Sequence, residues 1–265
     1  MKIRLLRHAT CVIVVNGQQL ILDPMFSPAG ALEPIPNVPN PSPNPLVGLP
    51  ETNNLLQALD AVIVTHTHRD HFDNRAQELL PKHLPLFCQP QDTAKITDAG
   101  FSDVRPVPSA IQWQGITLHR TGGQHGTGAI GARMAPVSGF VLTAPGEPTL
   151  YITGDTVFCP EVAEALKTHQ PDLVLAFAGN AQFHEGDPIT MGWPDLLQVT
   201  QAVPQAKLCV IHMEAWNHCR LSRAELGRLI QTHHLAERVF VPADGTWFHD
   251  PVEDPMECPL KRPLR

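Results

Sequence analysis

The chain opens with short apolar runs that have the two-residue period of β-strands. Residues 2–7 and 11–15 alternate or run apolar, and the run QQLILD follows directly after Asn16-Gly17. An Asn-Gly pair between two such runs is a strong signal for a tight hairpin turn. The first segment of the chain is therefore predicted to form antiparallel strands.

Two later parts of the chain alternate between apolar runs of strand length and segments of helical period. The first predicts strands at 61–65 and 85–88 and helices at 74–80 and 91–98, with Gly100 ending the second helix. The last part predicts helices at 160–168, at 194–202 and after the capping box Ser222 to Glu225, with strands in LVLAF, KLCVIH and RVFVP.

Between these parts, residues 103–153 hold five short apolar runs, which predict a second, antiparallel sheet region: VRPVP, IQW, GITLHRT, SGFVLTA and PTLYIT. Each half of the chain thus supplies strands followed by helices. The fold class predicted from this pattern is α/β (α+β), with two packed mixed β-sheets and helices on the outer faces.

A proline-rich segment, residues 24–50, interrupts the first half. Proline lacks the backbone N–H that ladders and helices need, so a long loop is predicted here. Loops of this length in compact domains serve as covers or substrate walls, or simply wrap the surface, and the composition leaves both open. We interpret residues 1–265 as a single domain that contains this loop, with a polar, proline-containing tail in the last fifteen or so residues.

Composition narrows the class of protein. The chain has 265 residues, 43% hydrophobic and 17% charged, which is enough for a large core. A formal net charge of -7 argues against a nucleic-acid partner. The first residues have no signal-peptide pattern and no apolar run is long enough to span a bilayer, so no membrane association and a cytoplasmic location are expected. The six cysteines form no CxxC pair, which predicts reduced thiols rather than a disulfide framework.

The stretch THTHRDH directly follows the apolar run 61–65 and concentrates three histidines and a carboxylate. His66 and His68 are two positions apart and would point the same way in extended chain, while Asp70 and His71 follow as the chain turns toward a helix. This spacing predicts two metal positions. Imidazole and carboxylate ligands suit zinc best, with manganese or iron as alternatives. The competing interpretation is a surface cluster of hydrogen-bonded histidines.

Three later residues are candidate ligands, each with a plainer alternative: His125, Asp155 and His212. His125 lies in a glycine-rich loop and could be an ordinary loop histidine. Asp155 follows the run TLYIT through Gly154 and could instead cap the next helix. His212 ends the run KLCVI directly, and we favour it over His218 and His249 for that reason.

The segment THTHRDH resembles the HxHxDH signature of the metallo-β-lactamase superfamily. That resemblance implies a four-layer αββα sandwich with a dinuclear metal site between two sheets. It assigns ligands to the first metal, to the second and to a bridge between them: His66, His68 and His125; Asp70, His71 and His212; and Asp155.

The opening LLRHATCVIVVNGQQLILDPMF is similar to the L-ascorbate-6-phosphate lactonase-like branch of the superfamily, although Arg7 stands where that branch has glycine. The similarity implies that His8 and Asp23 lie near the site, as substrate contacts or partners of the ligands. From the residues alone, His8 could equally be a strand-turn histidine, and Asp23 before Pro24 could simply start a turn.

The expected function is metal-dependent hydrolysis of a small ester, lactone or phosphodiester, as in a lactonase or phosphodiesterase. Two divalent cations outweigh the charges of Asp70 and Asp155, which favours an anionic or carbonyl-bearing small-molecule substrate. A metal-bridging hydroxide would be the nucleophile and Asp70 would transfer a proton. His184 is a candidate for contact with the substrate or leaving group, although an ordinary loop histidine is the simpler interpretation. Residues 24–50 and the segments around His184 and Trp216 would shape the pocket. The alternative is a metal-binding regulatory or binding module of the same fold without turnover. A homo-oligomer is compatible with the sequence.

Overall fold

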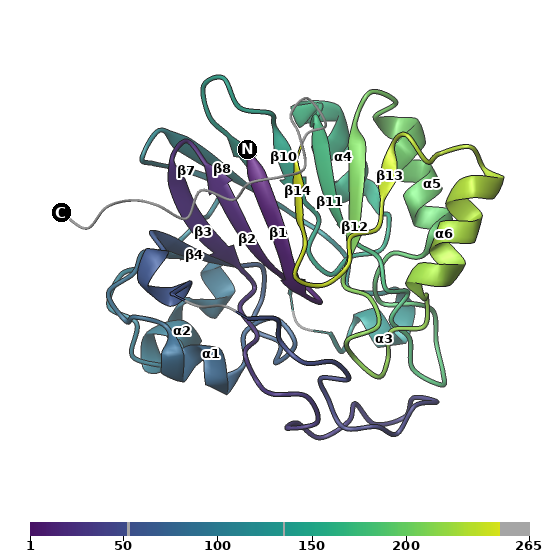
Figure 1. Cartoon of the computed structure of the whole chain (residues 1–265), viewed down its shortest axis with the longest axis horizontal. Helices are drawn as coiled ribbons and strands as arrows, with labels where there is room; N and C mark the ends of the chain where they lie inside the picture. Colours follow the sequence, from purple (N-terminus) through teal and green to yellow (C-terminus); the bar gives the residue numbers. More distant parts are fainter. Residues whose placement is uncertain (52–53, 135, 250–265) are drawn as a thin grey trace.

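The computed structural model describes residues 1–51, 54–134 and 136–249, and it has two mixed β-sheets packed face to face (Figure 1). Within these residues the first sheet has seven strands in the order β14-β1-β2-β3-β4-β5-β6. Its strands are β14 (Trp247–His249), β1 (Lys2–Arg7), β2 (Thr10–Val15), β3 (Gln18–Leu22), β4 (Ala61–Val64), β5 (Leu86–Cys88) and β6 (Val104–Pro106). The predicted antiparallel start is confirmed, since β1, β2 and β3 form a meander.

The second sheet has, in the described residues, the order β13-β12-β11-β10-β9-β8-β7. Its strands are β13 (Val239–Phe240), β12 (Lys207–Ile211), β11 (Leu173–Phe177), β10 (Leu150–Ile152), β9 (Gly139–Thr143), β8 (Ile116–Thr121) and β7 (Ala110–Trp113). In each sheet one half is antiparallel and the other parallel. Each sheet therefore combines hairpins with helical crossovers.

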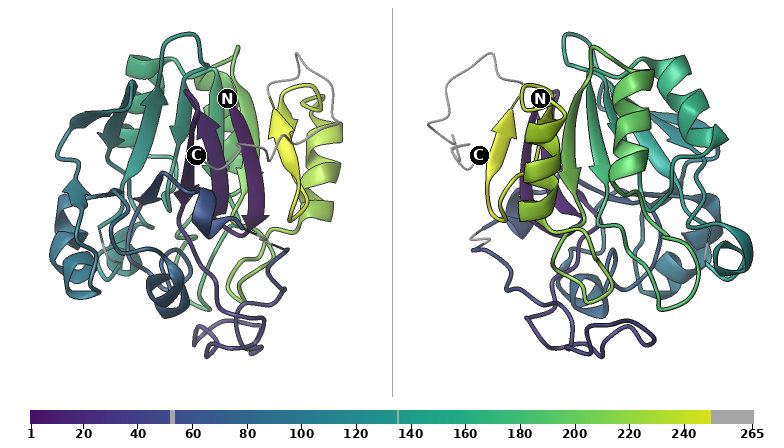
Figure 2. Two further views of the ribbon diagram at one scale, coloured as in Figure 1. Left: turned by 60° about the vertical axis from the view of Figure 1, so that its left-hand side comes forward. Right: turned by 90° about the vertical axis from the view of Figure 1, so that its right-hand side faces the viewer.

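Helices cover the outer faces of both sheets, as Figure 2 shows. The helices α1 (Asn74–Leu79) and α2 (Thr93–Asp98) bury Ala76 and Ile96 against the first sheet. The helices α4 (Pro160–His169), α5 (Trp193–Ala202) and α6 (Arg223–Thr232) cover the second sheet. A third apolar cluster fills the space between the sheets. The predicted four-layer αββα arrangement is confirmed.

The structure differs from the sequence prediction in the placement of one strand and in four short elements. The run VRPVP was placed in the second sheet, but β6 pairs in parallel with β5 in the first sheet. The strand β14, the short helix α3 (Gly128–Gly131) and the 3-10 turns η1 (Leu56–Ala58) and η2 (Pro90–Asp92) were not predicted, because each is too short to show a periodic pattern. The predicted polar tail lies outside the described residues. Within them, no helix is long and apolar enough to cross a membrane.

The proline-rich loop, residues 24–50, lies at the end of the sandwich where most helices begin (Figure 1). The fully buried Arg7 guanidinium donates to the carbonyl oxygens of Val47, Met25 and Ser27 at 2.9 to 3.0 Å. Asp73 accepts hydrogen bonds from the backbone of Phe26 and Ser27 at 3.1 and 2.7 Å. The loop is thus tied to the body of the fold at its start and near its end.

A second anchor joins the middle of this loop to the segment after β12. The buried Asn44 and Asn217 exchange hydrogen bonds of 2.9 Å, and the Asn217 amide also donates to the carbonyl oxygens of Ile35 and Asn40. Next to them, Trp216 is fully buried against loop side chains. The loop therefore packs beside the segment that carries His212.

Candidate metal centre

The candidate ligands all follow the carboxyl ends of strands at one edge of the sandwich. Strands β1, β3 and β4 run in the same direction, as do β8, β10 and β12 of the other sheet. The residues that follow these six strands are His8, Asp23, the segment 66–71, His125, Asp155 and His212. Polar side chains from both sheets therefore meet at this edge of the sandwich. They lie in loops, so the loop backbone determines where each side chain points.

Local backbone conformation explains how these side chains turn inward. His8, Asp23 and His212 have φ of 59°, 42° and 65°, in the left-handed region that non-glycine residues seldom adopt. Gly154, directly before Asp155, has φ of 66°, and a Cβ there would lie 2.5 Å from the Ser138 carbonyl oxygen. Such costly conformations cluster at functional sites, where the surrounding structure enforces them.

A first group of ligand atoms comes from His66, His68 and His125, and these atoms lie within 4.8 Å of one another. The Nδ1 atom of His125 is 2.7 Å from the Ile189 carbonyl oxygen, which leaves Nε2 as the free ligand atom. The Nε2 atom of His66 is buried and has no hydrogen-bond partner in the described part of the chain. A buried imidazole nitrogen without a partner is costly unless something binds it.

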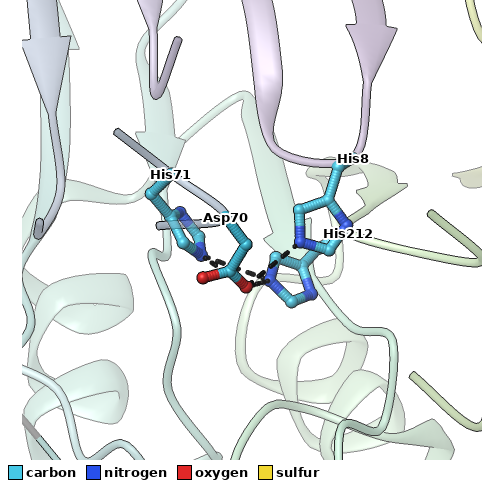
Figure 3. Close-up of side chains that lie close together, drawn as sticks. All are labelled: His8, Asp70, His71 and His212. Atoms are coloured by element: carbon cyan, nitrogen blue, oxygen red, sulfur yellow. Dashed lines mark hydrogen bonds and ion pairs between the residues drawn. The ribbon is translucent and has the colours of Figure 1, made fainter. Parts of the chain in front are cut away.

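A second group comes from His8, Asp70, His71 and His212, whose ligand atoms also lie within 4.8 Å of one another (Figure 3). The Oδ2 atom of Asp70 is 3.4 Å from Nε2 of His8 and 3.6 Å from Nε2 of both His71 and His212. The two Nε2 atoms of His71 and His212 are 3.3 Å apart. All four side chains are buried.

Asp155 lies between the two groups. Its Oδ2 is 3.2 Å from Nε2 of His71 and 3.6 Å from Nε2 of His125, and its Oδ1 is 3.2 Å from Nε2 of His212. A third set of converging ligand atoms joins it to His66 and His71. Asp155 does not cap the following helix, whose N-cap is Cys159. Its carboxylate therefore faces both groups.

Asp23 orients one candidate ligand, His71, through the ring nitrogen Nδ1. Its fully buried carboxylate accepts from the backbone N–H and the hydroxyl of Thr65, both at 2.7 Å, and lies 2.8 Å from Nδ1 of His71. A carboxylate on Nδ1 fixes the imidazole tautomer that presents the Nε2 lone pair to a metal. Asp23 thus contacts a candidate ligand, as the sequence resemblance implied.

The pKa shifts of the candidate ligands suit the binding of a cation. Burial lowers the pKa of His66 well below its ordinary value, and the neighbours His71 and His68 lower it further. Burial would also lower the pKa of His71, but Asp155, Asp70 and Asp23 together raise it to about 10. Without a metal, a proton on His71 would balance these carboxylates. Displacing that proton would free a set of nitrogen and carboxylate donors, which suits zinc, manganese or iron.

Not every predicted residue joins the cluster. His184 is exposed, and its backbone N–H donates to the Asn37 carbonyl oxygen in the proline-rich loop. His249, in β14, pairs with Lys2 at the start of β1. His8 follows the other end of β1, so His249 lies at the opposite end of this strand from the cluster. His218, the other rival of His212, is buried with its ring centroid 6.3 Å from that of His212, and it is in none of the ligand groups of the described residues.

The sequence did not single out two further features of the site. Arg69, between His68 and Asp70, places its guanidinium 5.3 Å from the centre of the Trp216 ring and donates to the Glu33 carbonyl oxygen. Cys219 places its sulfur 3.8 Å from Nδ1 of His212. Arg69 had the motif position as a signal, whereas Cys219 reaches His212 only through tertiary folding.

Comparisons with known proteins identify the family of this chain. Residues 20–213 match the description "Beta-lactamase superfamily domain". The chain is 36% identical over 249 residues to "UPF0173 protein YddR" of Bacillus subtilis, covering 92% of this chain and 98% of that protein. A "UPF0173 metal-dependent hydrolase" of Xanthobacter autotrophicus is 23% identical over 203 residues, covering 72% of this chain and 74% of that protein.

Solved structures give the same result. The "isothiocyanate hydrolase from Delia radicum gut bacteria" has a TM-score of 0.90 and 35% identity, covering 94% of this chain and 99% of that one. A "possible metal-dependent hydrolase" from Veillonella parvula has a TM-score of 0.90 and 33% identity, covering 94% and 98%. The chain belongs to the metallo-β-lactamase superfamily, among the UPF0173 metal-dependent hydrolases.

Proposed function

We propose that this metal-dependent hydrolase uses two metal ions to activate water against the electrophilic carbon of a small, largely apolar substrate. The observation that carries the proposal is the placement of Asp155 between two converging groups of ligand atoms. Bound metal ions lower the pKa of water to about 7 and polarise the bond under attack. No serine or cysteine nucleophile is then needed.

The residues of the chain supply the remaining functions. Burial would raise the pKa of Asp70, but His71, His212 and His8 together hold it well below its usual value, so this carboxyl is ionised at neutral pH. The Asp70 carboxylate can accept the proton of the attacking water and return it to the leaving group. Asp70 is 6% exposed, and its neighbours along the chain, His68 and Arg69, are half-buried.

The side chains beside Asp70 favour a substrate with an apolar group. Arg69 lies over Trp216 and binds the backbone of Glu33, so the proline-rich loop meets the site beside Asp70. The half-buried Leu32 and Ile35 of that loop pack against the Trp216 cluster. Pockets for small substrates combine such apolar walls with a few polar groups. We interpret the loop as a substrate wall.

An isothiocyanate fits this chemistry, and hydrolysis of isothiocyanates is what the name of the Delia radicum structure states. Its N=C=S carbon is electrophilic in the same way as an ester carbonyl carbon. Addition of water to this carbon and cleavage of the C–N bond give an amine and carbonyl sulfide, with both protons of water ending on the amine nitrogen. Esters, lactones and phosphodiesters are the substrates expected from the sequence.

Purified protein loaded with zinc, manganese or iron tests the proposal on three probes: 2-phenylethyl isothiocyanate, a γ-lactone and bis(p-nitrophenyl) phosphate. We expect release of phenylethylamine from the first, abolished by a chelator and by Asp155→Ala. Turnover of the lactone or the phosphodiester alone would replace the proposed substrate class. Inertness of the metal-loaded protein toward all three would support the binding module without turnover.

A further inference from the structure

His8 occupies an unusual place in the fold. It lies in the turn between β1 and β2, far in sequence from the HTHRDH segment, and its side chain is fully buried. Its Nε2 atom faces Asp70 at 3.4 Å, and its ring centroid is 3.8 Å from that of His212 (Figure 3). Its Nδ1 atom has no hydrogen-bond partner among the described residues. In the described ranges no carboxylate contacts Nδ1 of His8, whereas Asp23 contacts Nδ1 of His71.

The separations in the second group match the edges of a coordination tetrahedron. Metal–nitrogen and metal–oxygen bonds of about 2.1 Å at tetrahedral angles place neighbouring ligand atoms about 3.4 Å apart. Four of the six separations are 3.4 Å for His8 to Asp70, 3.6 Å for Asp70 to both His71 and His212, and 3.3 Å for His71 to His212. The 3.4 Å distance is long for a hydrogen bond between imidazole and carboxylate.

The turn that carries His8 is held firmly on both sides. The His8 carbonyl oxygen accepts the backbone N–H of His212 at 2.9 Å, which ties the turn to the end of β12. The adjacent Arg7 side chain is fixed by the carbonyl oxygens of the proline-rich loop. Thr10 donates its hydroxyl to the carbonyl oxygen of Asp23 at 2.7 Å. Ligands held in this way are already placed for binding before a metal arrives.

We propose that His8 is a direct metal ligand, which completes a set of four protein ligands with Asp70, His71 and His212. The other group contributes three histidines, and the carboxylate of Asp155 faces both groups. The proposal rests on metal binding at this site and not on the identity of the substrate.

Metal binding to variants of the whole protein tests the proposal. His8→Asn suits the site because asparagine tolerates the left-handed conformation that His8 adopts. In competition with a chromophoric chelator, we expect His8→Asn to lose more than about 100-fold in affinity at one cobalt position, because even a supporting partner of a ligand accounts for about 10–100-fold. Asp23→Asn provides that supporting-partner reference, and His184→Asn, at an exposed position, is the unaffected control.

The visible spectrum of bound cobalt reports coordination directly. Replacing an imidazole of a four-ligand site by water weakens the absorption bands, so His8→Asn should lower their intensity while His184→Asn leaves it unchanged. Unchanged affinity and an unchanged spectrum in His8→Asn would overturn the proposal. These readouts do not depend on turnover, so a failure of the proposed hydrolysis is distinguishable from a failure of this assignment.

A measurement on the unmodified protein covers the case in which His8→Asn does not fold. In nitrogen-15 histidine spectra of the zinc-loaded wild type, metal-bound imidazole nitrogens are distinguishable from free ones. Three histidines from each group, counting His8, predict six metal-bound rings. Five metal-bound rings would mean that His8 only contacts Asp70, and the assignment would be wrong.

Discussion

Asp23→Asn is the substitution that most directly tests how the site is organised. Asparagine has the same shape as aspartate, so the packing around this fully buried side chain is kept. It has one oxygen to accept hydrogen bonds, and its NH2 group replaces the Oδ2 atom that faces Nδ1 of His71 at 2.8 Å. Two donors cannot face each other, so His71 must carry its proton on Nε2 instead. That tautomer blocks the nitrogen that faces Asp70 and Asp155.

The size of the effect follows from these contacts. Loss of an outer partner of a metal-bound histidine lowers metal affinity about 10–100-fold, which corresponds to about 1.4–2.7 kcal/mol. Each hydrogen bond to a charged acceptor such as the Asp23 carboxylate contributes about 1.5–3 kcal/mol to the free energy of folding. A loss of about 2 kcal/mol lowers Tm by about 4–8 °C in a chain of this size. Both changes are large enough to measure.

The assay compares Asp23→Asn with the wild type in thermal unfolding and in zinc competition with a chelator. Asp60→Asn is a matched control, since the Asp60 carboxylate accepts only the Gln19 backbone N–H at 2.8 Å among the hydrogen bonds of the described residues. This control should keep wild-type metal affinity. If Asp23→Asn lost stability but kept full affinity for both metals, Asp23 would only stabilise the fold and the tautomer argument would be refuted.

Three further predictions concern the metals, the loop and pH. Asp155→Ala should abolish hydrolysis and empty at least one metal position in elemental analysis, whereas normal turnover would contradict its bridging role. Arg7→Met leaves three carbonyl oxygens of the loop without the guanidinium donor. We therefore expect the free energy of unfolding in denaturant to fall by about 3 kcal/mol and proteolysis within 24–50 to become faster; unchanged proteolysis would mean that Arg7 does not hold the loop. In the metal-free protein, burial would lower the pKa of His71 but Asp155 and Asp70 raise it to about 10. The stability from this raised pKa is complete below about pH 6.5 and is lost as pH rises through 10, so Tm of the chelated protein should fall over that range; an equal fall in the metal-loaded protein would contradict the assignment.

Much of the fold could be predicted because its signals are local. The Asn16-Gly17 turn and the capping box at Ser222 each specify an element boundary within a few residues, and the structure confirms the hairpin and the Ser222 N-cap. Sheet membership is different, because it depends on partners far along the chain. The run VRPVP has the period of a strand but no signal for its neighbour, and β5 lies between it and the rest of the first sheet.

The candidate site divides in the same way. The HTHRDH segment carries its chemistry within six residues, so its four candidate metal ligands could be identified from the sequence directly. The nearness of His8 to His212 depends on the pairing of turns from two different sheets, which no local pattern encodes. The anchoring of residues 24–50 by Arg7 and Asn217 could not be predicted from the sequence either. A high proline content shows that a segment is irregular, but it does not show where the segment packs.

Each group of candidate ligands draws on both sheets, and this has a consequence for how the protein matures. The first group needs His125 in addition to the HTHRDH segment, and the second needs His212, which comes after four-fifths of the sequence. A chain emerging from the ribosome therefore offers only partial sets of donors until the second layer has formed against the first. Metal ions would therefore bind after the two sheets have assembled and would not direct their assembly. Bound metal would then indicate that the chain has finished folding.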